Sequence, residues 1–118
     1  MSPEEAFDHF KNGEIDDEEV KILSDYLVSQ WKGTFHDDLS KRVASEFKKR
    51  DNDGNHLSKK EKGIFISRLA EKIYSNALFE ALEATRNGLF NDLKELDWYF
   101  GIYLHYWLLR ATIKDFEV

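Results

Sequence analysis

The chain has 118 residues, of which 42% are hydrophobic and 34% charged, with a net charge of -6. This composition suits a single domain, residues 1–118, with a core of ordinary size. The sequence has no cysteine, which excludes disulfides, thiolate zinc sites and cysteine nucleophiles. It also shows no apolar leader and no run of about 20 apolar residues, so we expect a cytoplasmic protein without a membrane segment.

Charge is unevenly distributed along the chain. Residues 1–40 carry eleven acidic and three basic side chains, whereas residues 41–62 carry eight basic and four acidic ones. Phosphate binding needs clustered lysine and arginine, so the acidic first third disfavours nucleic acid as its ligand. Exposed carboxylates instead steer basic partners. Part of the acidic cluster at residues 14–19 is explained by helix capping alone, because carboxylates stabilise the first turn of a helix. The residues that we expect to bind a basic protein are Glu14, Asp16, Asp17, Glu18 and Glu19.

Three helices are predicted in the first half of the chain. The first begins at Ser2-Pro3, a cap followed by proline, and ends at Asn12-Gly13. The second begins after Asp16 and ends at Gly33, and the third spans about residues 37–49. Their buried positions recur at helical spacing, and are Val20, Leu23, Leu27, Trp31, Phe35, Leu39, Val43 and Phe47.

A long fourth helix and an aromatic fifth helix follow. Ser58 and Glu61 form a capping box, and the apolar pattern behind them continues to Asn87-Gly88, which predicts a helix about 40 Å long. The fifth helix, about residues 93–113, is apolar on two sides. One stripe holds Leu93, Leu96, Phe100, Tyr103, Leu104, Trp107 and Ala111, and the other holds Trp98, Ile102, Tyr106, Leu109 and Ile113.

Two apolar stripes predict that the fifth helix is central and covered by the others, with Phe100, Leu104 and Trp107 buried. The alternative is an exposed stripe kept for a partner, including another copy of the chain. No segment alternates with period two for long. The sequence therefore predicts an all-α, compact bundle of about five helices.

One stretch, residues 47–61, contains a possible metal loop. It reads as a helix end, an oxygen-rich turn, the apolar Leu57 and an acidic residue that opens the next helix, and it resembles an EF-hand. The resemblance implies calcium as the metal. The implied ligands are Asp51, Asp53, Asn55 and Glu61.

The loop departs from the family's pattern in length and in its glycine. An EF-hand loop has 12 residues with a glycine after its third ligand, whereas Asp51 to Glu61 spans eleven residues and His56 follows Asn55. An upstream stretch, residues 7–19, is similar to the second half of such a loop, with Ile15 placed to pair with Leu57. The resemblance covers residues 3–86, and the simpler alternative is two helix-turn-helix corners with ordinary capping residues.

Residues for catalysis are not visible in the sequence. The four histidines, His9, His36, His56 and His105, include no pair spaced for zinc on one helix face. There is no glycine-rich phosphate loop and no nucleophile elbow. We therefore expect neither an enzyme nor a cofactor.

Three hypotheses of function remain open. The first is a small acidic protein that binds and inhibits another macromolecule, as immunity proteins, antitoxins and phage inhibitors do, by analogy of composition. The second is an EF-hand-like calcium sensor. The third is an assembly protein that uses the aromatic helix.

Overall fold

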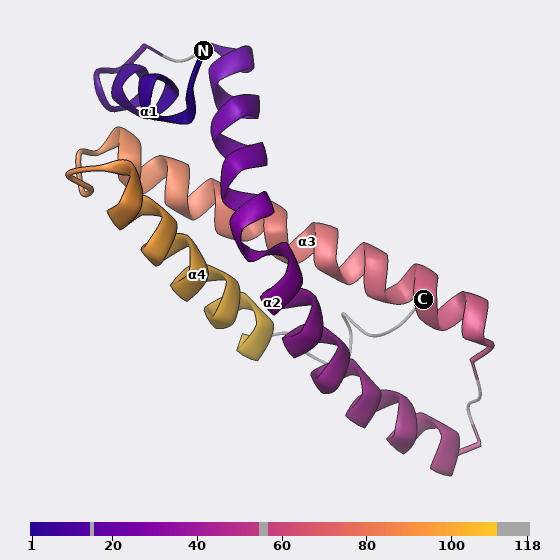
Figure 1. Cartoon of the computed structure of the whole chain (residues 1–118). Helices are drawn as coiled ribbons and strands as arrows, with labels where there is room; N and C mark the ends of the chain where they lie inside the picture. The colour runs from indigo at the N-terminus through magenta and orange to yellow at the C-terminus, as the bar shows by residue number, and fades with distance from the viewer. Residues whose placement is uncertain (15, 55–56, 111–118) are drawn as a thin grey trace.

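The computed structural model describes residues 1–14, 16–54 and 57–110. Over these residues the protein is all-α, as predicted, and has four helices: α1 (Pro3–Lys11), α2 (Asp17–Asn52), α3 (Lys59–Arg86) and α4 (Leu93–Arg110). Figure 1 shows α2 and α3 as two long rods, with α1 across one end and α4 beside the upper half of α3. The molecule is elongated, with extents of 53 × 22 × 21 Å.

The fold has one helix where the sequence predicted two. Gly33 does not end a helix, because α2 continues through it to Asn52, and Gly33 is not among the glycines with positive φ. A glycine inside a helix costs only about 1 kcal/mol relative to alanine. Burial of Leu27 and Phe35 on either side offsets that cost.

The buried side of α2 turns gradually around the helix. Its apolar residues recur every four positions from Leu23 to Phe47, and each step of four advances the direction by about 40° beyond a full turn. The early part of α2 therefore faces α1, and later parts face α4 and α3. One helix can thus contribute to the core along most of the molecule.

The turns follow the capping residues expected from the sequence. Ser2 and Asp16 cap α1 and α2, and Ser58 and Glu61 form the capping box of α3. Gly13 and Gly88 adopt φ of 86° and 75°, a left-handed conformation that glycine adopts without strain. The predicted long helix is therefore present as α3.

α3 and α4 pack closely because α3 presents small side chains to its neighbour. Ala77 and Ala81 are fully buried, as are Phe100 and Leu104 on α4, and α3 and α4 form the most extensive helix pair. Burial of Phe100 and Leu104 is therefore confirmed, whereas Trp107 is only half-buried.

The two corners compared with EF-hand loops lie far apart. The α1–α2 corner and the α2–α3 turn are at opposite ends of α2 (Figure 1), whereas paired EF-hand loops lie side by side. No strand occurs within the described ranges. Ile15, which was expected to pair with Leu57, lies outside them.

Candidate functional site

Four apolar side chains of α4 are exposed in a single row. Their exposed fractions are 60% for Trp98, 43% for Ile102, 43% for Tyr106 and 73% for Leu109. We call these four residues the α4 row. The expectation that other helices cover both stripes of α4 is therefore wrong for the second stripe, whose last member, Ile113, lies outside the described residues.

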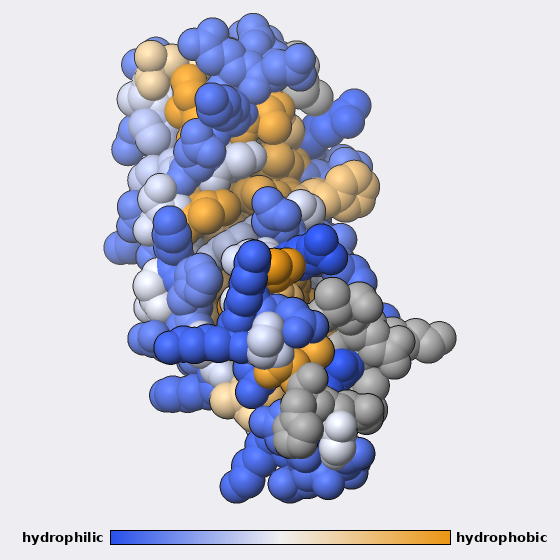
Figure 2. Space-filling view, turned by 90° about the vertical axis from the view of Figure 1, so that its right-hand side faces the viewer, coloured by the Kyte–Doolittle hydropathy of each residue, from blue (hydrophilic) through white to orange (hydrophobic). Residues whose placement is uncertain are grey.

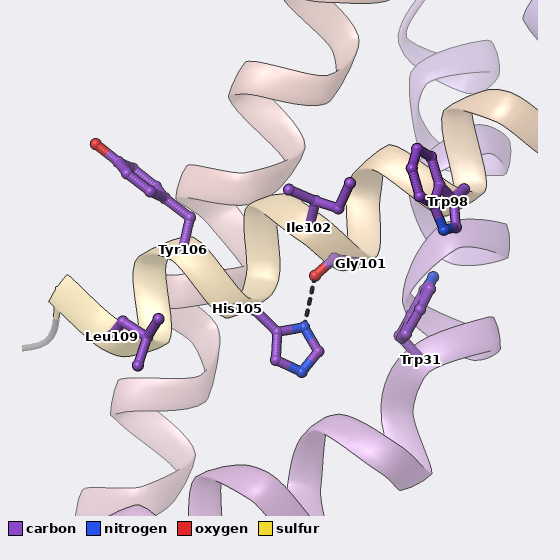
Figure 3. Close-up of a pocket in the computed structure, with 7 residues that line it drawn as sticks. All are labelled: Trp31, Trp98, Gly101, Ile102, His105, Tyr106 and Leu109. Carbon is purple, nitrogen blue, oxygen red and sulfur yellow. Dashed lines mark hydrogen bonds between the residues drawn. The ribbon is translucent and has the colours of Figure 1, made fainter.

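The α4 row follows one side of the helix over three turns. Its members are spaced by four, four and three residues, so they point in similar directions and span about 16 Å. Figure 3 shows Trp98, Ile102 and Tyr106 along one side of α4, with Leu109 at its lower end. Figure 2 shows one face of the molecule, on which hydrophilic side chains predominate and hydrophobic ones are gathered in patches between them.

A shallow hollow of about 440 Å³ lies along the α4 row. One wall comes from Trp31 of α2, and α4 supplies the rest. The complete lining is Trp31, Trp98, Gly101, Ile102, His105, Tyr106 and Leu109. The hollow is therefore an open, largely aromatic groove at the crossing of two helices.

Gly101 allows α2 to approach α4 at this crossing. A Cβ added at Gly101 would lie 2.3 Å from Cζ2 of Trp31, so only glycine leaves room for the indole. The indole Nε1 donates to the backbone oxygen and to Oδ1 of Asp97, both at 3.1 Å. Burial raises the pKa of Asp97, and the hydrogen bond from Trp31 partly opposes that rise. Trp31 is thus held in place as the wall of the groove.

His105 links the two helices at the edge of the same groove. Its Nδ1 lies 2.8 Å from the backbone oxygen of Gly101, and its Nε2 lies 3.1 Å from Oδ2 of Asp38 on α2. The side chain of His105 is half-exposed, and both of its ring nitrogens are engaged. The contact of Nδ1 lies within α4, and only the contact of Nε2 with Asp38 joins α4 to α2.

The acidic residues expected to bind a partner divide into two groups. Glu14, Asp17 and Glu18 are exposed, as is Asp16, which caps α2 through its side chain. Glu19 is buried, with its Oε1 2.5 Å from Nδ1 of His9. It therefore joins α1 to α2 and lies outside any docking surface.

The contact between α1 and α2 includes a histidine, His9, whose pKa is raised. The hydrogen bond to Glu19 raises the pKa of His9, burial opposes this, and the negative charges of Glu19, Glu14 and Glu5 raise it further. The ring of His9 is 39% exposed.

Two of the four expected metal ligands, Asp51 and Glu61, are engaged in contacts with other residues. Asp51 belongs to the last turn of α2, and its Oδ2 lies 3.4 Å from Nζ of Lys62. The carboxylate of Glu61 accepts the N–H of Ser58. Asp53 is the exposed C-cap of α2, and Asn55 lies outside the described residues.

The described part of the chain has neither a cluster of metal-ligating side chains nor a helix that could span a membrane. No group of three or more histidine, cysteine, aspartate or glutamate side chains could hold a metal ion there. None of the helices described is both long and apolar enough to cross a bilayer.

Comparison with known proteins gives no relative. No family model matches the chain, and no match was found among curated proteins or among solved structures. A function for this chain therefore has to be inferred from its own geometry.

Sequence reasoning missed the groove because it assigned Trp31 to another role and gave Gly101 none. Trp31 was expected in the buried stripe of a helix, and Gly101 was not singled out. A glycine within an otherwise bulky aromatic helix is a signal of close approach by another element, and it could have indicated that a side chain crosses α4 there.

Proposed function

We propose that this chain is a protein-binding module that docks its partner on the α4 row. The observation that carries the proposal is the alignment of four exposed apolar side chains beside a groove walled by Trp31. Contiguous exposed apolar surface on a monomer frequently marks an interaction site.

The composition of the α4 row fits a protein interface. Tryptophan and tyrosine are enriched among residues whose truncation weakens binding most, because each offers a large, rigid contact surface. The hollow beside Trp98 and Ile102 is open and lined mainly by apolar groups. It suits one apolar side chain of a partner, with the indole of Trp98 as a neighbouring contact.

The groove is held in its binding shape by contacts outside the α4 row. Trp31 is fixed through Asp97, and His105 joins α4 to α2 through Asp38. A surface that is already ordered loses less conformational entropy on binding. These contacts support docking without a large rearrangement.

Site-specific photo-crosslinking tests this proposal. A photoreactive amino acid replaces Ile102 in one variant and Phe79 in the control variant. Phe79 is on α3 and is 71% exposed. It is two residues from each of the buried Ala77 and Ala81, so it lies on the opposite side of the helix, facing away from the core. We expect covalent protein adducts from position 102 in native host cells and none from position 79. Equal yields at both positions, or no adduct at 102, would contradict the proposal.

The acidic corner supports a second candidate function, binding of a basic partner. Glu14, just before α2, and Asp17 and Glu18, in its first turn, are exposed. Exposed charge mainly raises association rates and is screened by salt. Reversing Asp17 and Glu18 should slow association with such a partner as added salt does, and association that is independent of salt would exclude this role.

A further inference from the structure

We infer that the partner on the α4 row is a second copy of this chain, packed antiparallel about a twofold axis. The inference rests on the proposed function, because it names the occupant of the same surface. Three features of the described residues support it: the shape of the row, its area and the positions of charge.

The first feature is the shape of the row. A narrow row that follows one helix for three turns is complementary to another helix carrying a similar row. α4 is itself such a helix. In a twofold arrangement the same surface serves both partners, so that Trp98 packs against Leu109 of the second copy and Ile102 against Tyr106 of the second copy.

The second feature is the available area. If each aromatic side chain offers about 200 Å² and each aliphatic one somewhat less, the exposed fractions of the α4 row correspond to roughly 400 Å². Two copies would bury roughly 800 Å² from these residues alone, where a stable interface buries about 1,200–2,000 Å² in total. The α4 row therefore provides an apolar centre for a dimer, and polar residues around it provide the remainder.

The third feature is the separation of charge along the molecule. The acidic corner, with Glu14, Asp17 and Glu18 exposed, and the basic turn, with Lys59 and Lys60 exposed, are at opposite ends of α2 (Figure 1). For a helix of 36 residues this is about 54 Å. An antiparallel dimer brings the acidic end of each copy toward the basic end of the other, whereas a parallel dimer aligns like charges.

Analytical ultracentrifugation over a wide concentration range tests the dimer. We expect the wild-type chain to pass from monomer to dimer as concentration rises, with a dissociation constant that increases with salt. Trp98→Ala should raise the dissociation constant by a factor of about 30 or more, as expected for a central aromatic contact. Phe79→Ala, which truncates an aromatic side chain that is also exposed but lies outside the α4 row, should leave the dissociation constant nearly unchanged.

A double-mutant cycle tests the antiparallel register. Trp98 and Leu109 are about 16 Å apart within one helix, too far to couple in a monomer. In the antiparallel dimer they touch across the interface, so the effects of Trp98→Ala and Leu109→Ala on dissociation should be strongly non-additive. Additive effects would overturn the register.

A charge swap provides an independent readout. Reversing Asp17 and Glu18 to lysine, or Lys59 and Lys60 to glutamate, should weaken dimerisation in each case. Combining all four changes should restore much of the affinity, because opposite charges face each other again. Failure of the combination to recover would contradict the antiparallel arrangement.

The outcomes separate this inference from the proposed function. A wild-type chain that stays monomeric at every concentration overturns the dimer. If position 102 then crosslinks to a different protein, docking on the α4 row stands with another occupant. If position 102 gives no adduct, both proposals fail. An adduct of two copies of the chain supports both.

Discussion

Replacing Gly101 with alanine should disturb the crossing of α2 and α4, where the groove is formed. The new Cβ would lie 2.3, 2.4 and 2.8 Å from three carbons of the Trp31 indole. Ordinary carbon contacts are about 3.5–4.0 Å, so the indole must move by more than 1 Å. That movement removes it from the two oxygens of Asp97, each 3.1 Å away.

The expected net effect is a loss of about 1–3 kcal/mol in the free energy of unfolding. Overpacking costs about 1–3 kcal/mol and the lost hydrogen bonding adds about 1 kcal/mol. The better helix propensity of alanine offsets about 1 kcal/mol of this loss. Urea unfolding followed by circular dichroism measures the difference.

Gly63→Ala is the matched control for this substitution. Gly63 also lies within a helix, but a Cβ there meets nothing within 4 Å, so the variant should gain up to about 1 kcal/mol. If Gly101→Ala is stabilised as much as Gly63→Ala, Trp31 does not cross α4 at this glycine and the description of the groove is wrong.

Three further predictions concern other parts of the chain. Gly33→Ala should raise the free energy of unfolding by about 0.5–1 kcal/mol in urea unfolding if α2 is continuous, and a loss would indicate that a helix ends there. His9 should stabilise the fold below its unfolded pKa of 6.5 and lose this effect as pH rises through its raised folded pKa. Melting temperatures across that range should show the slope, and His9→Gln should lack it. Calorimetric titration with calcium should show no binding at physiological concentrations, because Asp51 and Glu61 are engaged by Lys62 and Ser58. Heat that disappears on combining Asp51→Ala with Asp53→Ala would show that the loop binds calcium after all.

The helix class and most helix ends were predictable because they depend on local chemistry. The helix caps are examples, because each cap side chain bonds to a backbone N–H only two or three residues away: Ser2, Asp16 and Ser58. The continuity of α2 was also predictable from the sequence. Apolar residues recur every four positions from Leu23 to Phe47, and this spacing does not change at Gly33. The prediction failed because a single glycine was weighted above that repeat.

The exposure of the α4 row was not predictable from sequence. Its members Ile102 and Leu109 are as apolar as Leu104, which is buried, and periodicity does not say which stripe meets a neighbour. Coverage depends on how many helices surround α4. The sequence predicted two helices where the structure has the single helix α2. The described part of the chain therefore has one helix fewer than predicted to cover α4. The contact of His9 with Glu19 likewise depends on how α1 folds back on α2.

The claim that the α4 row is a docking surface is tested most directly by measuring both the free energy of unfolding and the association of the Trp98→Ala variant. Because Trp98 is 60% exposed, its truncation should change the free energy of unfolding of the monomer by no more than about 0.5 kcal/mol. Association measured by ultracentrifugation or crosslinking should be largely lost. A destabilisation of about 3–5 kcal/mol, typical of a buried tryptophan, with association unchanged would show that Trp98 belongs to the core and that the α4 row is not a docking surface.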